Sequence, residues 1–381
     1  MKSMAEASAE WPAAGPDRLV VYLLGAGFGE SQIVLFPDGR CLVVDSCIHF
    51  KKNLTAVVLR KLGVKRIDLF AVTHSDLDHL DGTPSLLDAF NPEHVMSYPY
   101  VAVLRSLCAT WLREKPHHER LRELHETLNR LDGLAELDRM TQVSWESTPW
   151  PVVPGDYAVQ PIAPSQVDAA ACQLDLNRMI TREEGKGWTV SAAGQRLLDG
   201  ARSLGDRPNR LSIALSVTWR NRRVLLAGDV ENGLASQRYS GWKGILAKLQ
   251  KRKLSRLVSE LDMVKAAHHG SSGAYHEAAW LLHAKPDGST ITAIAPFNRG
   301  HTPLPQSSTL ESIRRHGAAL GLTMDARSAF ERARDSGWLP GAPDGLTMKA
   351  LSSPGPVIAV TLHENGGAEL FAGKAAAFFH R

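Results

Sequence analysis

The sequence predicts an α/β fold made of two similar β-rich halves, because the same order of features occurs twice along its 381 residues. In each half a predicted hairpin ends in an aspartate, Asp45 in the first half and Asp229 in the second. A further apolar strand then ends in histidine, first at His74 and later at the pair His268 and His269. If the two halves meet with these strand ends together, their polar side chains share one edge of the fold, where layered folds commonly bind ligands.

The first half contains four predicted strands before His74. Residues 19–24 form an apolar run, and residues 32–36 and 41–44 are two further runs that predict a hairpin. The residues between them, Pro-Asp-Gly at 37–39, suit the turn because proline presets the bend and glycine accepts a positive φ. The apolar run 69–72 has the length of a buried strand.

The second half repeats this arrangement. Residues 211–219 alternate strictly between apolar and polar side chains, which is typical of a half-buried strand, and residues 224–227 complete the hairpin. Further strands are predicted at residues 263–267, 291–296, 357–362 and 368–372.

We expect one domain over residues 18–381, after a flexible N-terminus of residues 1–17. Three inserts are predicted near residues 98–140, 165–208 and 327–355. The first has apolar residues at a period of 3.6 and should be helical, so it could form a cap over a site.

Four ligand-type side chains lie within six residues directly after strand 69–72: His74, Asp76, Asp78 and His79. Buried charges need a partner or a metal, so this density favours a metal site over a solvated acidic turn. Alternate residues 74, 76 and 78 can face one side and the adjacent pair 78 and 79 another, which suggests two neighbouring ions.

This loop resembles the His-x-His-x-Asp-His metal motif of the metallo-β-lactamase superfamily, with Asp76 where most members have a second histidine. The same aspartate variant occurs among relatives of the competence protein ComEC. Blocks that match this subgroup follow in order at residues 27–31, 42–45, 209–212, 226–231, 268–271 and 300–303. The resemblance implies a four-layer αββα sandwich, with two sheets packed face to face, helices outside and helical inserts.

The resemblance also implies two sets of metal ligands that share Asp229. The first set would be His74, Asp76 and Asp229, and the second Asp78, His79, Asp229 and either His268 or His269. The third histidine of lactamase-type members has no counterpart here, which leaves the first ion with few protein ligands. Asp45 is expected to support the metal loop from behind.

Three residues are assigned catalytic roles: His268, Asp78 and His301. His269 is the preferred metal ligand and His268 the group that binds a phosphoryl oxygen or protonates the leaving alkoxide, although the reverse assignment stays open. His301 is either a substrate contact or an ordinary loop histidine.

Charge favours a phosphodiester substrate, because two dications outweigh the three carboxylates Asp76, Asp78 and Asp229 by one positive charge. The additional carboxylate also favours manganese, with zinc as the alternative. The leading hypothesis is therefore a metal-dependent hydrolase, a nuclease acting on DNA or RNA. The alternatives are a phosphodiesterase for small molecules of the phosphorylcholine or cyclic-nucleotide type, and a non-catalytic binding or signalling module. A lactamase is not expected, because that chemistry generally uses zinc and more histidine ligands.

Composition is consistent with a globular enzyme that binds an anion. The chain is 44% hydrophobic, and its formal net charge is +4. Its four cysteines show no Cys-x-x-Cys spacing, which indicates a reduced, cytoplasmic setting. No signal segment and no apolar run of membrane-spanning length is found, so a membrane partner is not expected and the chain differs from ComEC itself.

Overall fold

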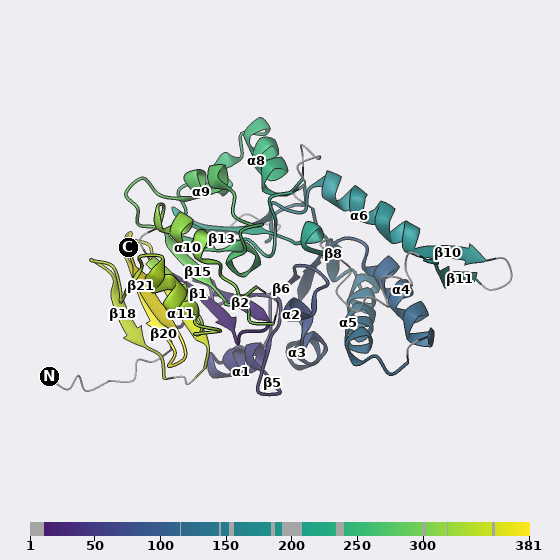
Figure 1. Ribbon diagram of the computed structural model, residues 1–381. Helices are drawn as coiled ribbons and strands as arrows, with labels where there is room; N and C mark the ends of the chain where they lie inside the picture. Colours follow the sequence, from purple (N-terminus) through teal and green to yellow (C-terminus); the bar gives the residue numbers. More distant parts are fainter. Residues whose placement is uncertain are drawn as a thin grey trace.

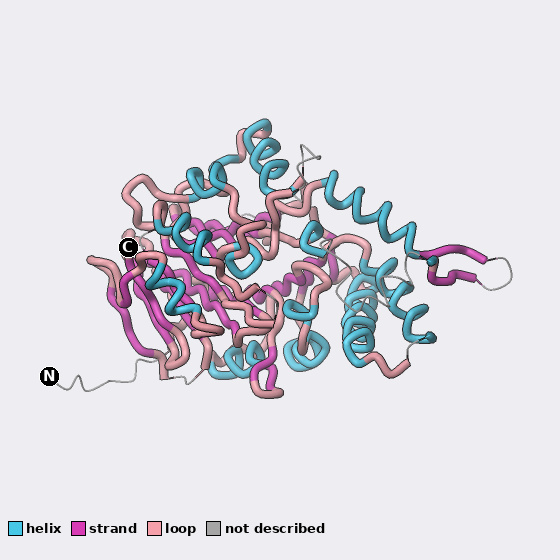
Figure 2. Tube along the Cα trace, in the orientation of Figure 1, coloured by secondary structure: helices cyan, strands magenta, loops and turns pink. Residues whose placement is uncertain are grey.

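The computed structural model describes residues 11–114, 116–144, 146–151, 156–183, 187–192, 208–233, 240–299, 302–317, 319–352 and 355–381. Within these residues two large β-sheets form the centre of the molecule, and helices cover their outer faces (Figures 1 and 2). This arrangement confirms the predicted four-layer αββα sandwich with helical inserts.

The first sheet has the strand order β18-β20-β19-β1-β2-β3-β6-β7-β8. Its strands are β1 (Arg18–Gly25), β2 (Glu30–Leu35), β3 (Cys41–Val44), β6 (Leu69–Val72), β7 (His94–Ser97), β8 (Met140–Gln142), β18 (Thr347–Ala350), β19 (Val357–His363) and β20 (Ala368–Ala372). The hairpin β2–β3 is antiparallel, whereas β3, β6 and β7 run parallel to one another.

The second sheet has the order β17-β21-β16-β15-β14-β13-β12-β9. Its strands are β9 (Tyr157–Pro161), β12 (Leu215–Trp219), β13 (Arg222–Leu226), β14 (Met263–Lys265), β15 (Ile291–Ile294), β16 (Ala319–Leu322), β17 (Leu339–Pro340) and β21 (Ala377–His380). An antiparallel hairpin, β12–β13, is again followed by parallel strands β14 and β15. The repeat predicted from the sequence is therefore present in the pairing of the strands.

The core lies between the two sheets, and strand alternation decides which side chains enter it. Val224 and Leu226 of β13 pack in the cluster that contains the residues of β1 to β3. The intervening Leu225 faces the other way and packs beneath the outer helices. These helices are α8 (Gly241–Lys251), α9 (Glu277–His283), α10 (Ser307–Arg314) and α11 (Ala329–Asp335).

The helices α1 (Leu54–Lys61), α2 (Leu77–Leu80) and α3 (Thr83–Phe90) lie beside the first sheet. The first insert is helical, as predicted, and consists of α4 (Val101–Glu114) and α5 (Glu119–Glu136). In the second insert α6 (Gln166–Met179) leads to the hairpin β10 (Ile180–Glu183) and β11 (Gly187–Val190), which extends away from the sandwich (Figure 1). Residues 184–186 and 193–207 of this insert lie outside the described residues.

At the N-terminal end, Trp11 stacks on Tyr22 of β1 with ring centroids 5.8 Å apart. Residues 1–10 of the predicted flexible segment lie outside the described residues. No helix in the described part of the chain combines the length and the apolar character needed to span a membrane.

Candidate metal centre

The predicted ligands meet at the carboxyl ends of strands from both sheets. Asp78 and His79 come from the loop and short helix after β6, Asp229 follows β13, and His269 follows β14. Each of the four offers a nitrogen or oxygen atom, and these atoms all lie within 4.8 Å of one another. His79, Asp229 and His269 are buried, and Asp78 is only partly exposed. Residues separated by up to 191 positions thus form one compact cluster.

Asp45 fixes the orientation of His79. Its carboxylate accepts hydrogen bonds from the backbone N–H of Thr73 (2.8 Å) and from the Thr73 hydroxyl (2.7 Å). The same carboxylate lies 2.7 Å from Nδ1 of His79, which therefore donates to it. A histidine that donates from Nδ1 has its Nε2 lone pair free for a metal. Nε2 of His79 faces Asp229 Oδ1 at 3.4 Å and Asp78 Oδ2 at 3.8 Å.

His269 is oriented in the same way by a backbone carbonyl. Its Nδ1 donates to the carbonyl oxygen of Ala295 (2.8 Å), and its Nε2 lies 3.2 Å from Asp78 Oδ2 and 3.9 Å from Asp229 Oδ2. His268 and His269 both have left-handed backbones, with φ of 47° and 51°. The two side chains consequently leave the turn in different directions, and His269 is the one that joins the cluster.

His268 lies beside the cluster, with Nε2 at 4.0 Å from Asp229 Oδ2 and its side chain 26% exposed. Its Nδ1 is 3.2 Å from Glu231 Oε1, and the side-chain amide of Asn209 donates to the same carboxylate oxygen. Glu231 and Asn209 therefore orient His268, although the sequence assigned them no role. The spacing Asp229-x-Glu231 is the sequence feature that could have indicated this role for Glu231.

His74 and Asp76 form a separate pair next to the cluster. Because the Thr73 hydroxyl donates to Asp45, it accepts from Nδ1 of His74 at 2.9 Å, which leaves Nε2 of His74 free. That Nε2 atom lies 3.7 Å from Asp76 Oδ2, and the rings of His74 and His79 are 4.2 Å apart. Within the described residues no ion-pair distance joins His74 to Asp229. The structure thus brings together the second predicted ligand set with His269, and places His74 and Asp76 of the first set beside it.

The unpaired atoms of these residues fit a divalent cation. Nε2 of His74, Nε2 of His79 and Oδ1 of Asp229 are buried and make no hydrogen bond within the described residues. Buried polar atoms are nearly always paired, so these unpaired nitrogens and oxygen fit a ligand of positive charge. Imidazole nitrogens and carboxylate oxygens are the ligands that zinc and manganese use in proteins. The cluster is therefore a site for divalent metal.

The charges of the cluster depend on one another. Burial alone would raise the pKa of Asp78 and of Asp229, but His79 and His269 outweigh it and hold both pKa values well below the ordinary range. Burial would lower the pKa of His79, but Asp229, Asp45 and Asp78 raise it well above its usual value. Without metal, His79 is therefore an imidazolium that balances the carboxylates, and a bound metal ion would replace that proton.

Glu30 and Lys265 form a buried ion pair directly behind Asp229, and the sequence did not predict this role for Glu30. Both side chains are fully buried. Lys265 Nζ also donates to the carbonyl oxygen of Gly228 (2.9 Å) and lies 3.5 Å from Asp229 Oδ1. Lys265 therefore joins β14 to β2, and its burial gives it a structural role. A charged residue in each of two largely apolar strands is the sequence feature that could have indicated this buried ion pair.

The remaining candidate, His301, lies outside the described residues.

The helical insert contacts the metal loop through Glu123 of α5, which accepts a hydrogen bond from the backbone N–H of Gly82 at 2.9 Å. The helical insert is thus attached to the end of the metal loop.

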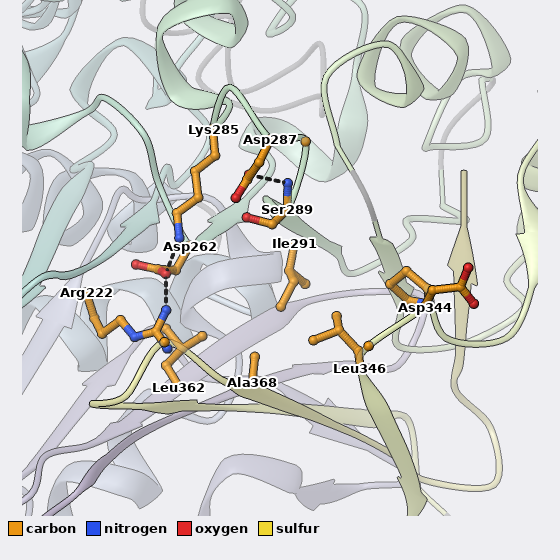
Figure 3. A pocket seen from close by; sticks show the side chains of 14 residues that line it. Arg222, Asp262, Lys285, Asp287, Ser289, Ile291, Asp344, Leu346, Leu362 and Ala368 are labelled. Atoms are coloured by element: carbon orange, nitrogen blue, oxygen red, sulfur yellow. Dashed lines mark hydrogen bonds and ion pairs between the residues drawn. The ribbon is translucent and has the colours of Figure 1, made fainter.

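A second buried charge cluster lies at the opposite, amino-terminal ends of β13 to β15 (Figure 3). The Asp262 carboxylate accepts hydrogen bonds from the Arg222 guanidinium, from Lys285 Nζ (2.6 Å) and from the backbone N–H of Arg223 (2.8 Å). Arg222 also donates to the carbonyl oxygens of His363 and Gly367, which belong to the β19–β20 hairpin of the first sheet. The side chains of Arg222, Asp262 and Lys285 line a cavity of about 260 Å³.

No protein-family model and no curated protein matches this chain. Among solved structures, it is similar to Igni18, a metallo hydrolase of the archaeon Ignicoccus hospitalis, with 12% identity, 72% of this chain and 82% of that chain covered, and a TM-score of 0.34. The short form of human tRNase Z shows 14% identity, 72% and 91% coverage and a TM-score of 0.32. The Rm3 metallo-β-lactamase shows 12% identity, 68% and 77% coverage and a TM-score of 0.32.

The order and direction of the chain's own strands define its fold. Two stacked mixed sheets, the repeated hairpin and parallel strands in each, and ligand loops at one edge make up the metallo-β-lactamase fold.

Proposed function

We propose that this protein is a metal-dependent hydrolase of the ComEC-like type that cleaves phosphodiester bonds in nucleic acid. The observation that supports this most directly is the convergence of Asp78, His79, Asp229 and His269 within 4.8 Å. These four residues would hold one divalent ion, and His74 with Asp76 would contribute to a second beside it. Manganese is the favoured metal, because carboxylates are hard ligands, and zinc is the alternative.

When bound, such ions lower the pKa of a coordinated water and stabilise negative charge on phosphoryl oxygens. The protein's own residues prepare the site for this chemistry. Asp45 and the Ala295 carbonyl hold the rings of His79 and His269 with Nε2 toward the cluster. The Glu30–Lys265 pair is neutral as a unit, so it stabilises the position of Asp229 without adding net charge.

His268 is the proposed general acid. Burial lowers its pKa, but in the metal-free site Asp229 and Glu231 outweigh burial and raise it to about 9, so folding favours the protonated ring. Glu231 holds Nδ1, and the partly exposed ring presents Nε2–H beside the cluster. From there His268 can donate a proton to the leaving oxygen or a hydrogen bond to a phosphoryl oxygen.

The charge of the site supports an anionic diester as the substrate. Two dications carry four positive charges, and Asp76, Asp78 and Asp229 supply three negative ones. The surplus of one positive charge suits the single negative charge of a phosphodiester, whereas a neutral substrate would leave it unbalanced.

The test is hydrolysis by purified protein loaded with manganese or zinc, offered single-stranded DNA, duplex DNA, RNA and small diesters. Asp229→Asn should lower the rate about a thousandfold, because it removes a charge that both ions would share. Asp344→Asn, the same substitution at an exposed aspartate, is the matched control and should retain full activity. Cleavage of small diesters alone would favour the small-molecule alternative, and equal rates for Asp229→Asn and wild type would refute the proposal.

A further inference from the structure

Beside the metal centre, the rings of Phe28 and Phe297 and the Arg299 side chain that covers Phe28 form a surface that we call the aromatic wall. The ring of Phe297 lies 5.2 Å from the ring of His269, and the rings of Phe28 and Phe297 are 5.8 Å apart. The Arg299 guanidinium lies over the Phe28 ring, 4.0 Å from its centroid. The wall therefore begins at a candidate metal ligand and leads outward to an exposed arginine.

The wall is not part of the hydrophobic core. Phe28 and Phe297 are partly exposed, and neither belongs to the two clusters of buried apolar residues that fill the sandwich. Arg299 makes no ion pair with any described residue, so its charge remains available to a ligand. Partly exposed aromatic rings beside a polar site are a common means of binding planar groups.

Backbone contacts hold the wall in place. Gly27 and Phe297 form a β-bridge, in which the backbone N–H of Asn298 donates to the carbonyl oxygen of Gly27 at 2.8 Å. Gly29 has a φ of 83°, and a Cβ atom there would lie 2.9 Å from the carbonyl oxygen of Asp78. Glycine at this position thus allows the loop that carries Phe28 to approach the metal loop closely.

We infer that the aromatic wall binds the base of the nucleotide next to the scissile phosphate. Phe28 and Phe297 supply the surface on which the base stacks. Arg299 supplies positive charge for the scissile phosphate attached to that nucleotide. This inference rests on the proposed function and specifies it further, because it makes a nucleobase, and not only a phosphodiester, part of what the site recognises. Stacking tolerates every base, so little sequence preference is expected.

The experiment compares two diesters that share a p-nitrophenol leaving group, thymidine 5′-p-nitrophenyl phosphate and methyl p-nitrophenyl phosphate. Their ratio of kcat/KM in the presence of manganese measures the contribution of the base. Phe28→Leu and Phe297→Leu should each lower this ratio about tenfold, because leucine keeps the apolar volume but offers no ring. Arg299→Gln should lower kcat/KM for both diesters and leave their ratio unchanged.

Phe371→Leu in β20 is the matched control, because Phe371 is a buried phenylalanine of the core away from the metal loops. A loss of stability affects both substrates equally, so the ratio for this variant should equal that of wild type. A second readout needs no catalysis: in EDTA, wild type should bind a labelled decathymidylate more tightly than an abasic strand of equal length, and Phe28→Leu should reduce the difference.

The outcomes separate the inference from the proposed function. If both diesters are cleaved and the ratio is the same in wild type, Phe28→Leu and Phe297→Leu, the wall does not bind a base, and the hydrolase proposal stands. If neither diester nor any nucleic acid is cleaved but base-dependent binding in EDTA is observed, the hydrolase proposal fails and the base site remains. If wild type binds both strands equally in EDTA, the inference is refuted.

Discussion

The two ends of β13 and β14 both carry buried charges, yet they differ in how these charges are satisfied. At the amino-terminal end, Asp262 accepts hydrogen bonds from Arg222 and Lys285 (Figure 3) and from the Arg223 backbone, and none of these residues has a buried side-chain nitrogen or oxygen without a partner. At the carboxyl end, Asp229 Oδ1 and His79 Nε2 have no hydrogen-bond partner in the described residues.

This difference separates a structural charge cluster from a binding site. Burial is similar at the two ends, so burial of charge does not by itself identify the site. What distinguishes the metal end is a set of buried imidazole nitrogens and carboxylate oxygens without hydrogen-bond partners, an arrangement that a bound cation stabilises. The Arg222 cluster, in contrast, connects the two sheets and is complete without a ligand.

The largest effect on stability is expected at the structural end. Asp262→Ala should lower the free energy of unfolding by about 3–5 kcal/mol, because the buried Arg222 and the half-buried Lys285 would lose their carboxylate. Urea titration followed by circular dichroism measures this change. Asp287→Ala, in the same cavity but exposed, should cost under about 1 kcal/mol. Equal losses for the two variants would mean that Asp262 does not stabilise the sandwich.

At the metal end, loss of an orienting residue should weaken metal binding more than folding. Asp45→Ala removes the acceptor that holds His79, so metal affinity should fall about 10–100-fold. Competition with a chelator measures the affinity. Thr73→Val provides a second variant, because it removes the hydroxyl between Asp45 and His74 and preserves side-chain shape. Unchanged affinity in both variants would contradict the proposed orientation.

The pH dependence of metal affinity should reflect the proton on His79. Because the pKa of His79 is raised well above 6.5 in the metal-free protein, a metal ion must displace a proton at neutral pH. Affinity should therefore increase about tenfold per pH unit for each displaced proton, until the pH exceeds the raised pKa. Calorimetry in buffers of different ionisation enthalpy should detect proton release at pH 7, and its absence would contradict the charge assignment.

The stability of the metal-free protein should decrease as the pH rises, whereas metal affinity should increase. The pKa of His268 is raised from 6.5 to about 9, so the protonated ring is favoured by folding. Its contribution is complete below about pH 6.5 and is lost as the pH rises toward 9. Thermal unfolding in EDTA should thus show a lower midpoint at pH 9 than at pH 6.5, and His268→Gln should reduce this difference.

The smallest effect is expected from a change in ligand hardness. Asp76→His replaces a carboxylate by an imidazole beside His74 and should shift metal preference toward zinc. Elemental analysis of protein exposed to equal manganese and zinc measures the preference. Asp344→His is the control for a new surface histidine, and an unchanged metal ratio for Asp76→His would remove the basis for favouring manganese.

The elements that deliver the ligands could be predicted from the amino-acid sequence. The run of apolar residues before His74 and the hairpins before Asp45 and Asp229 are local patterns, because strand periodicity and turn residues depend on near neighbours. It also gave the repeat of the two halves, which the strand pairing confirms. The metal-binding character of the loop followed from ligand density within six residues.

Which side-chain atoms lie close together depends on how distant parts of the chain pack. The selection of His269 over His268 depends on two left-handed residues and on the Ala295 carbonyl, which lies 26 positions further along the chain. The pairing of Glu30 with Lys265 likewise joins two sheets, and no local pattern relates residues so far apart. These contacts are set by how the halves pack, because only packing determines which buried charges become neighbours.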